Sequence, residues 1–202
     1  PLYSSAASDV YKSQPLLSKV RVSFIDSRKQ MGLVEKTISE YGYYLDEMME
    51  IINGLMSGDY FEYKGEIFDL ASIKLTPTPE FHVPLLVGGH AKPALRRAAR
   101  LSDGWIAAGG KIDEYKTMID TINEFRKEYG RDHLPFQIQA MSHDSFSVDG
   151  LMQLHAIGVT EVIIAFRDVY GKEADDKSVE EKTQMINWYS DNMIKPFREQ
   201  AA

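Results

Sequence analysis

The residues best suited to binding or chemistry form one short run, in which Val87, Gly88, Gly89, His90 and Ala91 follow an apolar stretch. Two adjacent glycines allow a sharp turn and leave no Cβ between the backbone and a ligand. Where such a turn opens a helix, the first backbone N–H groups have no partner within the helix, and the helix dipole adds positive potential. The run is therefore a candidate site for a phosphate. A tight turn without a ligand fits equally well, because a glycine pair is less specific than a full dinucleotide fingerprint.

The elements on either side of this run are predicted to be a strand and a helix. Residues 85–87 are apolar and follow Pro84, as in a short strand buried on both faces. Pro93 stands where the first residues of a helix are expected. The predicted helix has an apolar face made of Ala94, Leu95, Ala98, Ala99 and Leu101. Its other face carries Arg96, Arg97 and Arg100, which we expect to be solvated.

A strand followed by a helix is predicted four times along the chain. The strands are expected at residues 85–88, 105–108, 136–141 and 162–166. Such alternation indicates parallel strands joined by right-handed crossovers. It is typical of two α/β architectures, the open doubly wound sheet and the eightfold barrel. Four strands are too few to close a barrel, which typically needs about 250 residues.

The chain before these units is predicted to contain a helix, a hairpin and an extended link. An apolar stripe from Leu45 to Met56 indicates a helix that ends near Gly58. Two aromatic runs flank a turn at Lys64 and Gly65, as in a small surface hairpin. The prolines of the extended link are Pro77, Pro79 and Pro84.

The composition limits the partners of the protein. The 202 residues have a formal net charge of −7, so nucleic acid is not expected as a partner. The chain has no cysteine, which excludes disulfides and thiolate metal sites, and its histidines lack the spacing of metal ligands. No apolar run is long enough to span a membrane. We expect a cytoplasmic protein that acts on a small-molecule substrate.

Six blocks of the sequence together indicate a protein family. The most specific is LLVGGHAKPALRRAARLSDGW, at residues 85–105. The others are YGYYLDEMMEIINGLMSG, EYKGEIFDL, LTPTPEFHVP, GVTEVIIAF and the closing KPF. These blocks resemble the luciferase-like family, the bacterial luciferase superfamily of flavin- and deazaflavin-dependent oxidoreductases. The resemblance covers residues 32–198 and implies an α/β fold of the (β/α)8 TIM-barrel type.

The resemblance also implies a domain organisation. Residues 32–202 would be the C-terminal half of a luciferase-like barrel domain, a fragment that carries about the last four βα units. Residues 1–31 would be a partly disordered or non-native leader, because VRVSFIDSRKQ lacks the glycine-rich strand end that family members show there.

The function implied by the resemblance depends on a flavin-type cofactor. Deazaflavin coenzyme F-420 would support hydride transfer, and FMN would support monooxygenation. Residues 87–91 match the family's binding site for the cofactor phosphate. No catalytic residue is assigned, because much of the site would lie in the other half of the barrel. His143, Arg167 and Asp168 follow predicted strands, where barrel enzymes place reacting groups.

Two alternatives to this function stay open. The full-length protein is expected to be an oxidoreductase or monooxygenase, whereas the fragment alone would be a non-catalytic half-barrel if the missing half is essential. Such a half-barrel would bind the cofactor weakly or only self-associate through its unpaired sheet edges, and a homo-oligomer is expected in either case. A sugar-phosphate barrel enzyme would also use the phosphate site, but the chain shows no convincing arrangement of acid and base residues for it.

Overall fold

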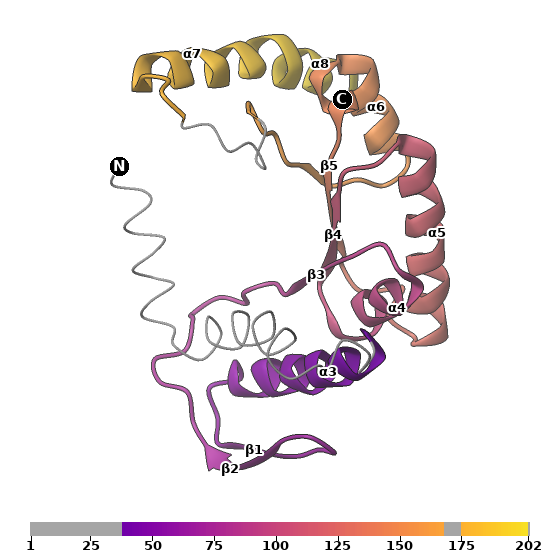
Figure 1. Cartoon of the computed structure of the whole chain (residues 1–202), viewed down its shortest axis with the longest axis vertical. Helices are drawn as coiled ribbons and strands as arrows, with labels where there is room; N and C mark the ends of the chain where they lie inside the picture. The colour runs from indigo at the N-terminus through magenta and orange to yellow at the C-terminus, as the bar shows by residue number, and fades with distance from the viewer. Residues whose placement is uncertain (1–37, 168–174, 202) are drawn as a thin grey trace, which may run out of the picture. The chain divides into compact units, whose positions relative to one another are not determined.

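The computed structural model describes residues 38–167 and 175–201, coloured from indigo to yellow along the chain in Figure 1. The leader predicted at residues 1–31 and the candidate Asp168 lie outside the described residues. Within the described ranges, no helix is long and apolar enough to cross a membrane.

The predicted anion site lies at the carboxyl end of an outer strand in a four-stranded parallel sheet. Its strands are β3 (Leu86–Gly88), β4 (Gly104–Ala108), β5 (Gln137–Met141) and β6 (Glu161–Val162). They lie in the order β3-β4-β5-β6, each parallel to the next. A doubly wound sheet reverses its strand order at a switch point. The sequential order is instead that of a (β/α)8 barrel, so the order of the strands decides between the two architectures that the sequence allows.

The helices pack against one face of this sheet. They are α4 (Lys92–Leu101), α5 (Ile112–Glu128) and α6 (Val148–Ala156), which follow β3, β4 and β5. The core contains strand residues Val87, Trp105, Ala107, Ile138 and Ala140 and helix residues Leu95, Ala98, Ala99, Ile119, Ile122, Phe125 and Leu154. The strand residues that alternate with them, such as Leu86, Ile106 and Gln139, are only partly buried. The buried face is therefore the one that a barrel turns toward its helices.

The last predicted strand is wrong in its extent. The apolar run at residues 162–166 predicts a strand, but β6 includes only its first residue, Val162. The N–H of Ile163 still donates to the carbonyl of Ala140 on β5 at 2.9 Å. One residue further on β5 ends, and the chain turns into the 3-10 helix η1 (His143–Phe146). The rest of the run then has no neighbouring strand to pair with among the described residues.

The elements before and after the sheet agree with the sequence predictions. Helix α3 (Ile38–Leu55) precedes an antiparallel hairpin made of β1 (Phe61–Lys64) and β2 (Asp69–Ile73). The closing helical segment consists of α7 (Val179–Tyr189), a π-helical turn η2 (Ser190–Ile194) and α8 (Lys195–Ala201). The predicted hairpin and closing helix are thus confirmed, except that a π turn interrupts the helix.

Candidate functional site

The predicted anion site lies at the carboxyl end of β3, where Val87 is buried and residues 88–91 are exposed. Because the strands are parallel, β4, β5 and β6 end at the same edge of the sheet. Gly89 has a φ of +117°, which residues with a side chain rarely adopt. A Cβ at this position would also lie only 3.0 Å from the Cβ of Ala94. The turn therefore needs glycine at position 89 for conformation and for space.

The first turn of α4 has backbone donors without partners. Its N-cap residue is Ala91, which has no side-chain acceptor, whereas the hydroxyls of Ser147 and Ser178 cap α6 and α7. Among the residues that the structure describes, none accepts a hydrogen bond from the backbone N–H of His90, Ala91 or Lys92. These donors and the helix dipole make this turn suited to binding an anion.

The turn is connected to the core by Trp105 of β4. This side chain is fully buried, and its indole Nε1 donates a hydrogen bond to the carbonyl of Gly89 at 2.8 Å. The ring centroid of His90 lies 6.0 Å from that of Trp105. Sequence reasoning identified Trp105 only as a strand residue. The bond depends on the alignment of β3 with β4, which no local pattern shows.

Tyr115 of α5 extends this connection to β5. Its ring packs edge-on against Trp105 at 6.4 Å between centroids, and its hydroxyl donates to the carbonyl of Met141 at 2.6 Å. Burial raises the pKa of the Tyr115 phenol, and the negative charges of Asp144 and Glu114 raise it further. The phenol therefore stays protonated and remains a donor. Trp105 and Tyr115 together tie the carboxyl ends of β3 and β5 to β4.

The other side chains that the sequence suggested stand apart from this turn. His143 follows β5 and Arg167 follows β6, as predicted, and both side chains are exposed. In the described part of the chain, no hydrogen bond or ion pair joins either of them to residues 87–91. The same part contains no group of three or more His, Asp or Glu side chains that is able to bind a metal ion.

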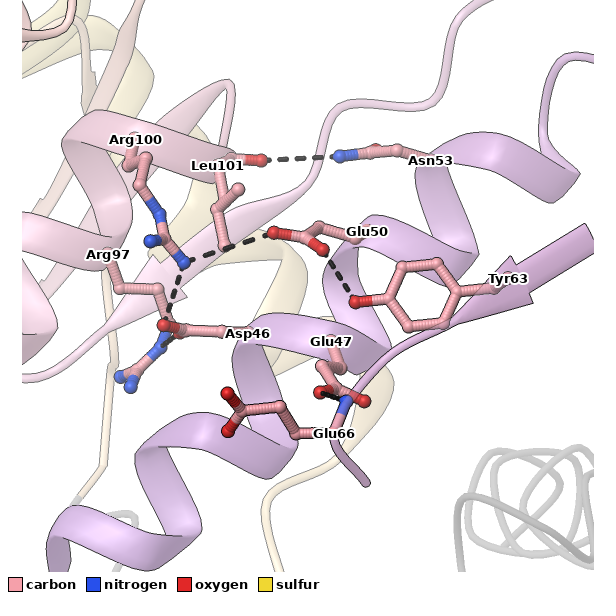
Figure 2. Close-up of polar contacts among 9 residues, drawn as sticks. All are labelled: Asp46, Glu47, Glu50, Asn53, Tyr63, Glu66, Arg97, Arg100 and Leu101. Atoms are coloured by element: carbon pink, nitrogen blue, oxygen red, sulfur yellow. Dashed lines mark hydrogen bonds and ion pairs between the residues drawn. The ribbon is translucent and has the colours of Figure 1, made fainter. Parts of the chain in front are cut away.

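A polar cluster links α3 to α4 and corrects one sequence prediction (Figure 2). The Arg97 guanidinium donates to Oδ1 of Asp46, and Nη2 of Arg100 lies 2.9 Å from Oδ2 of the same carboxylate. The prediction that all three arginines are solvated is wrong for Arg97, whose side chain is 11% exposed. It fits Arg96, which is 49% exposed. Asp46 is 51 residues from Arg97 in the sequence, so helix periodicity does not reveal the pair.

Glu47 of α3 binds the turn of the hairpin. Its carboxylate accepts hydrogen bonds from three successive backbone N–H groups, those of Glu66 at 2.7 Å, Ile67 at 3.2 Å and Phe68 at 2.9 Å. Burial alone would raise the pKa of the Glu47 carboxyl, but these donors outweigh it and lower that pKa. Three consecutive N–H groups thus bind a carboxylate of the protein itself, in the way that such groups bind a free anion in other proteins.

Two further residues of α3 continue this row of contacts (Figure 2). Glu50 accepts a hydrogen bond from the hydroxyl of Tyr63 on β1 at 2.7 Å, which raises the pKa of Tyr63 to about 12. Asn53 donates through Nδ2 to the carbonyl of Leu101, the last residue of α4, at 3.3 Å. Helix α3 therefore positions both the hairpin and the outer side of α4.

A cavity of about 600 Å³ lies beside the residues that follow β5 and β6. Its walls include the aromatic rings of Phe146, Phe166 and Trp188, together with Lys177 and Glu181. Aromatic walls with a few polar groups are typical of pockets for small organic molecules. The cavity therefore has the character of a pocket for a small organic molecule, and it lies near the carboxyl ends of the strands.

Comparison with known families agrees with this geometry. Residues 27–146 match the model of the family described as luciferase-like monooxygenase. The match spans more than half of the chain, and the chain belongs to this family. The resemblance inferred from the sequence blocks is confirmed.

Similar curated proteins include redox enzymes with two kinds of cofactor. An uncharacterized protein of Mycobacterium tuberculosis (strain ATCC 25618 / H37Rv) is 43% identical over 76% of this chain and 52% of that protein. An F420-dependent glucose-6-phosphate dehydrogenase of Microbacterium testaceum is 28% identical over 51% of this chain and 36% of the relative. An FMNH2-dependent dimethylsulfone monooxygenase of Pseudomonas fluorescens is 27% identical over 38% of this chain and 21% of the relative. The chain thus spans about half the length of the mycobacterial relative it matches.

A solved structure supports the fold. The coenzyme F420-dependent tetrahydromethanopterin reductase from Methanopyrus kandleri superposes with a TM-score of 0.60 at 14% identity, covering 76% of this chain and 62% of the reductase. The chain therefore has the α/β fold of the luciferase-like TIM barrels and covers part of such a barrel.

Proposed function

We propose that this protein is an oxidoreductase that depends on a flavin-type cofactor. Residues 87–91 bind the phosphate of this cofactor, which is deazaflavin coenzyme F-420 or FMN. The family supports a redox role, because the relatives include F420-dependent and FMNH2-dependent enzymes. When bound, F-420 supplies hydride transfer and FMN supplies oxygen chemistry. Residues 87–91 bind and orient the phosphate end of the cofactor.

The observation that carries this proposal is the uncapped start of α4 at the carboxyl edge of the sheet. An alanine at the N-cap costs a helix about 1 kcal/mol relative to serine. A phosphate that accepts hydrogen bonds from the N–H groups of His90, Ala91 and Lys92 would replace the missing cap and gain from the helix dipole. The absence of a Cβ at Gly88 and Gly89 lets the phosphate oxygens approach the backbone.

We further propose that the substrate is a small organic molecule. In barrel enzymes the reacting groups meet at the carboxyl ends of the strands. The cavity lined by Phe146 and Phe166 opens at this edge, since these residues follow β5 and β6. Its aromatic walls suit an apolar part of such a substrate.

A titration with matched ligand pairs tests the proposed function. Each pair compares a phosphate-bearing cofactor with its phosphate-free ribityl form, called its riboside for short: FMN with riboflavin, and F-420 with the deazariboflavin that it contains. We expect one of the two phosphate-bearing cofactors to bind at least about tenfold more tightly than its riboside, the effect of one or two charge-assisted hydrogen bonds. Binding is measured by the change in cofactor fluorescence. If neither pair is distinguished, the proposed phosphate site is wrong.

A further inference from the structure

The hydrogen bond from Trp105 fixes the direction of the peptide between Gly89 and His90. The carbonyl and the N–H of a trans peptide point in opposite directions. The carbonyl of Gly89 points at Nε1 of the fully buried Trp105, at 2.8 Å. The N–H of His90 belongs to the same peptide unit, so it points away from the core toward the exposed side of the turn.

This peptide needs a constraint from outside the turn. Gly89 lies at a φ of +117°, and a glycine backbone changes conformation at low cost. A half-turn of the peptide would present the carbonyl oxygen of Gly89 to an anion where the N–H of His90 had been. Such a half-turn would also leave the indole N–H of Trp105 buried without a partner, which is unfavourable. The indole therefore selects the orientation that offers a donor to an anion.

The indole ring itself has no freedom to follow a rotated peptide. Trp105 has no solvent exposure, and the edge of Tyr115 packs against it. The hydroxyl of Tyr115 is in turn bonded to the carbonyl of Met141. The direction of the Gly89 carbonyl is thus determined by a chain of contacts that starts on β5 and passes through α5 and β4.

We propose that Trp105 is a positioning residue for the cofactor phosphate: its indole N–H orients the Gly89 carbonyl so that the N–H of His90 faces the anion. This inference rests on the proposed function, because it concerns the same turn. In this arrangement Trp105 acts on the phosphate through the peptide between Gly89 and His90, which its indole N–H orients. Loss of the indole N–H should therefore weaken the binding of ligands that carry a phosphate and leave the binding of ligands without a phosphate unchanged.

Replacement of one atom in Trp105 tests the inference. The analogue β-(3-benzothienyl)alanine keeps the shape of tryptophan but has sulfur where the indole N–H stands. The chain has two tryptophans, so the analogue is directed to position 105 alone by suppression of an amber codon there, which leaves Trp188 in place. We expect the Kd for the preferred phosphate-bearing cofactor to rise at least about tenfold, while the Kd for its riboside stays unchanged. A purely structural role of Trp105 would change both values by the same factor.

Tyr189→Phe is the matched control. Tyr189 is also a buried aromatic residue, and its hydroxyl donates to the carbonyl of Ser145 at 2.8 Å. Removal of the Tyr189 hydroxyl deletes the same type of hydrogen bond without changing residues 87–91. The ratio of cofactor to riboside affinity should remain that of the unmodified protein.

The possible outcomes separate the inference from the proposed function. If the parent protein does not distinguish cofactor from riboside, the proposed function fails and the inference with it. If the parent distinguishes them and the analogue protein does so equally well, only the inference is overturned. If the protein with the analogue does not fold, NMR of the parent protein tests the inference instead. The amide proton resonance of His90 should move on addition of the preferred cofactor and not of its riboside, and an unmoved resonance would overturn the inference.

Discussion

At the scale of single residues, Gly88 and Gly89 are adjacent, but only Gly89 is required by the fold, whereas we propose that Gly88 serves the ligand. Gly89 has a positive φ and a close neighbour in Ala94, so a side chain there is strained. Gly88 has an ordinary backbone conformation, and an added Cβ would lie 3.9 Å from its nearest described neighbour, the carbonyl oxygen of Ile106. Substitutions at the two positions can therefore distinguish a requirement of the fold from the proposed requirement of the ligand.

We predict that Gly88→Ala weakens cofactor binding with little effect on stability. The protein has room for the methyl group, but a phosphate against the backbone does not, so the Kd should rise about tenfold. Gly89→Ala should instead destabilise the fold by about 1–2 kcal/mol. Thermal unfolding and cofactor titration of both variants give the comparison. Unchanged cofactor binding by the Gly88 variant would show that no ligand approaches this strand end.

Asp46 provides a second prediction, because it bonds two arginines and is only 23% exposed. Asp46→Asn should destabilise the protein by about 2 kcal/mol, since Arg97 would keep its charge in a mostly buried position without an anion. Asp120→Asn is the matched control. Its pair with Lys116 is 58% exposed on both sides, so its loss should cost no more than about 0.5 kcal/mol. Urea unfolding of both variants measures the difference, and equal effects would contradict the importance of burial.

Sequence reasoning predicted the elements around the candidate site, which depend on local chemistry, and missed the contacts that depend on residues far apart in the sequence. The glycine pair and Pro93 indicate a strand end and a helix start, and the structure places both as predicted. Trp105 and Arg97 have partners on other elements, and their roles follow only from strand alignment and helix docking. A single sequence contains no pattern from which such pairings can be read.

At the scale of elements, the attachment of the hairpin to α3 through Glu47 is sensitive to pH. The folded state lowers the pKa of this carboxyl below its ordinary value of 4.5, so the charged form stabilises the hairpin. This contribution is complete above pH 4.5 and is lost as the pH falls through the lower pKa of the folded state. Acid should therefore loosen the hairpin turn.

We predict that Glu47→Gln lowers the protection factors of the amides of residues 66–68 at neutral pH, and that these factors no longer fall further when acid is added. The neutral amide is a weaker acceptor for the three N–H groups than the carboxylate. Glu66→Gln is the control, because it removes a charge from the same turn and leaves the bonds to Glu47 in place. Equal exchange rates in the two variants would show that the carboxylate of Glu47 does not stabilise the turn.

The wrong length predicted for the last strand also has its cause at the scale of elements. The run Val162–Phe166 is apolar enough for a strand, and the sequence alone predicts one. Strand length also depends on the neighbour, and β5 ends soon after its pairing of Ala140 with Val162. Apolar composition predicts that a segment is buried, whereas hydrogen bonding to a neighbour decides whether it is a strand.

At the scale of the whole molecule, the sheet is the feature with consequences for assembly. In the described residues, β3 and β6 each pair with one neighbouring strand. Unpaired backbone groups at a sheet edge favour association with another chain. We propose on this basis that the 202-residue chain forms a homo-oligomer, which also fits the alternative of a half-barrel that self-associates without catalysis.

We predict that sedimentation equilibrium of this chain shows association at micromolar concentration. A monomer over the whole concentration range would contradict the proposal. Adding the preferred cofactor in the same experiment separates the two functional alternatives. A protein that binds cofactor tightly as an oligomer supports the oxidoreductase, and one that associates but binds cofactor weakly or not at all supports the non-catalytic alternative.

The row of contacts on α3 has a consequence for engineering. The three amide donors at the tip of the β1–β2 hairpin are matched by a carboxylate about twenty residues earlier in the chain, and the next turn of that helix binds β1 through Tyr63. A grafted hairpin without a tyrosine at the position of Tyr63 would leave Glu50 without its donor, and one with a different turn conformation would aim its N–H groups away from Glu47. A working chimera therefore has to exchange the helix face and the hairpin as one module.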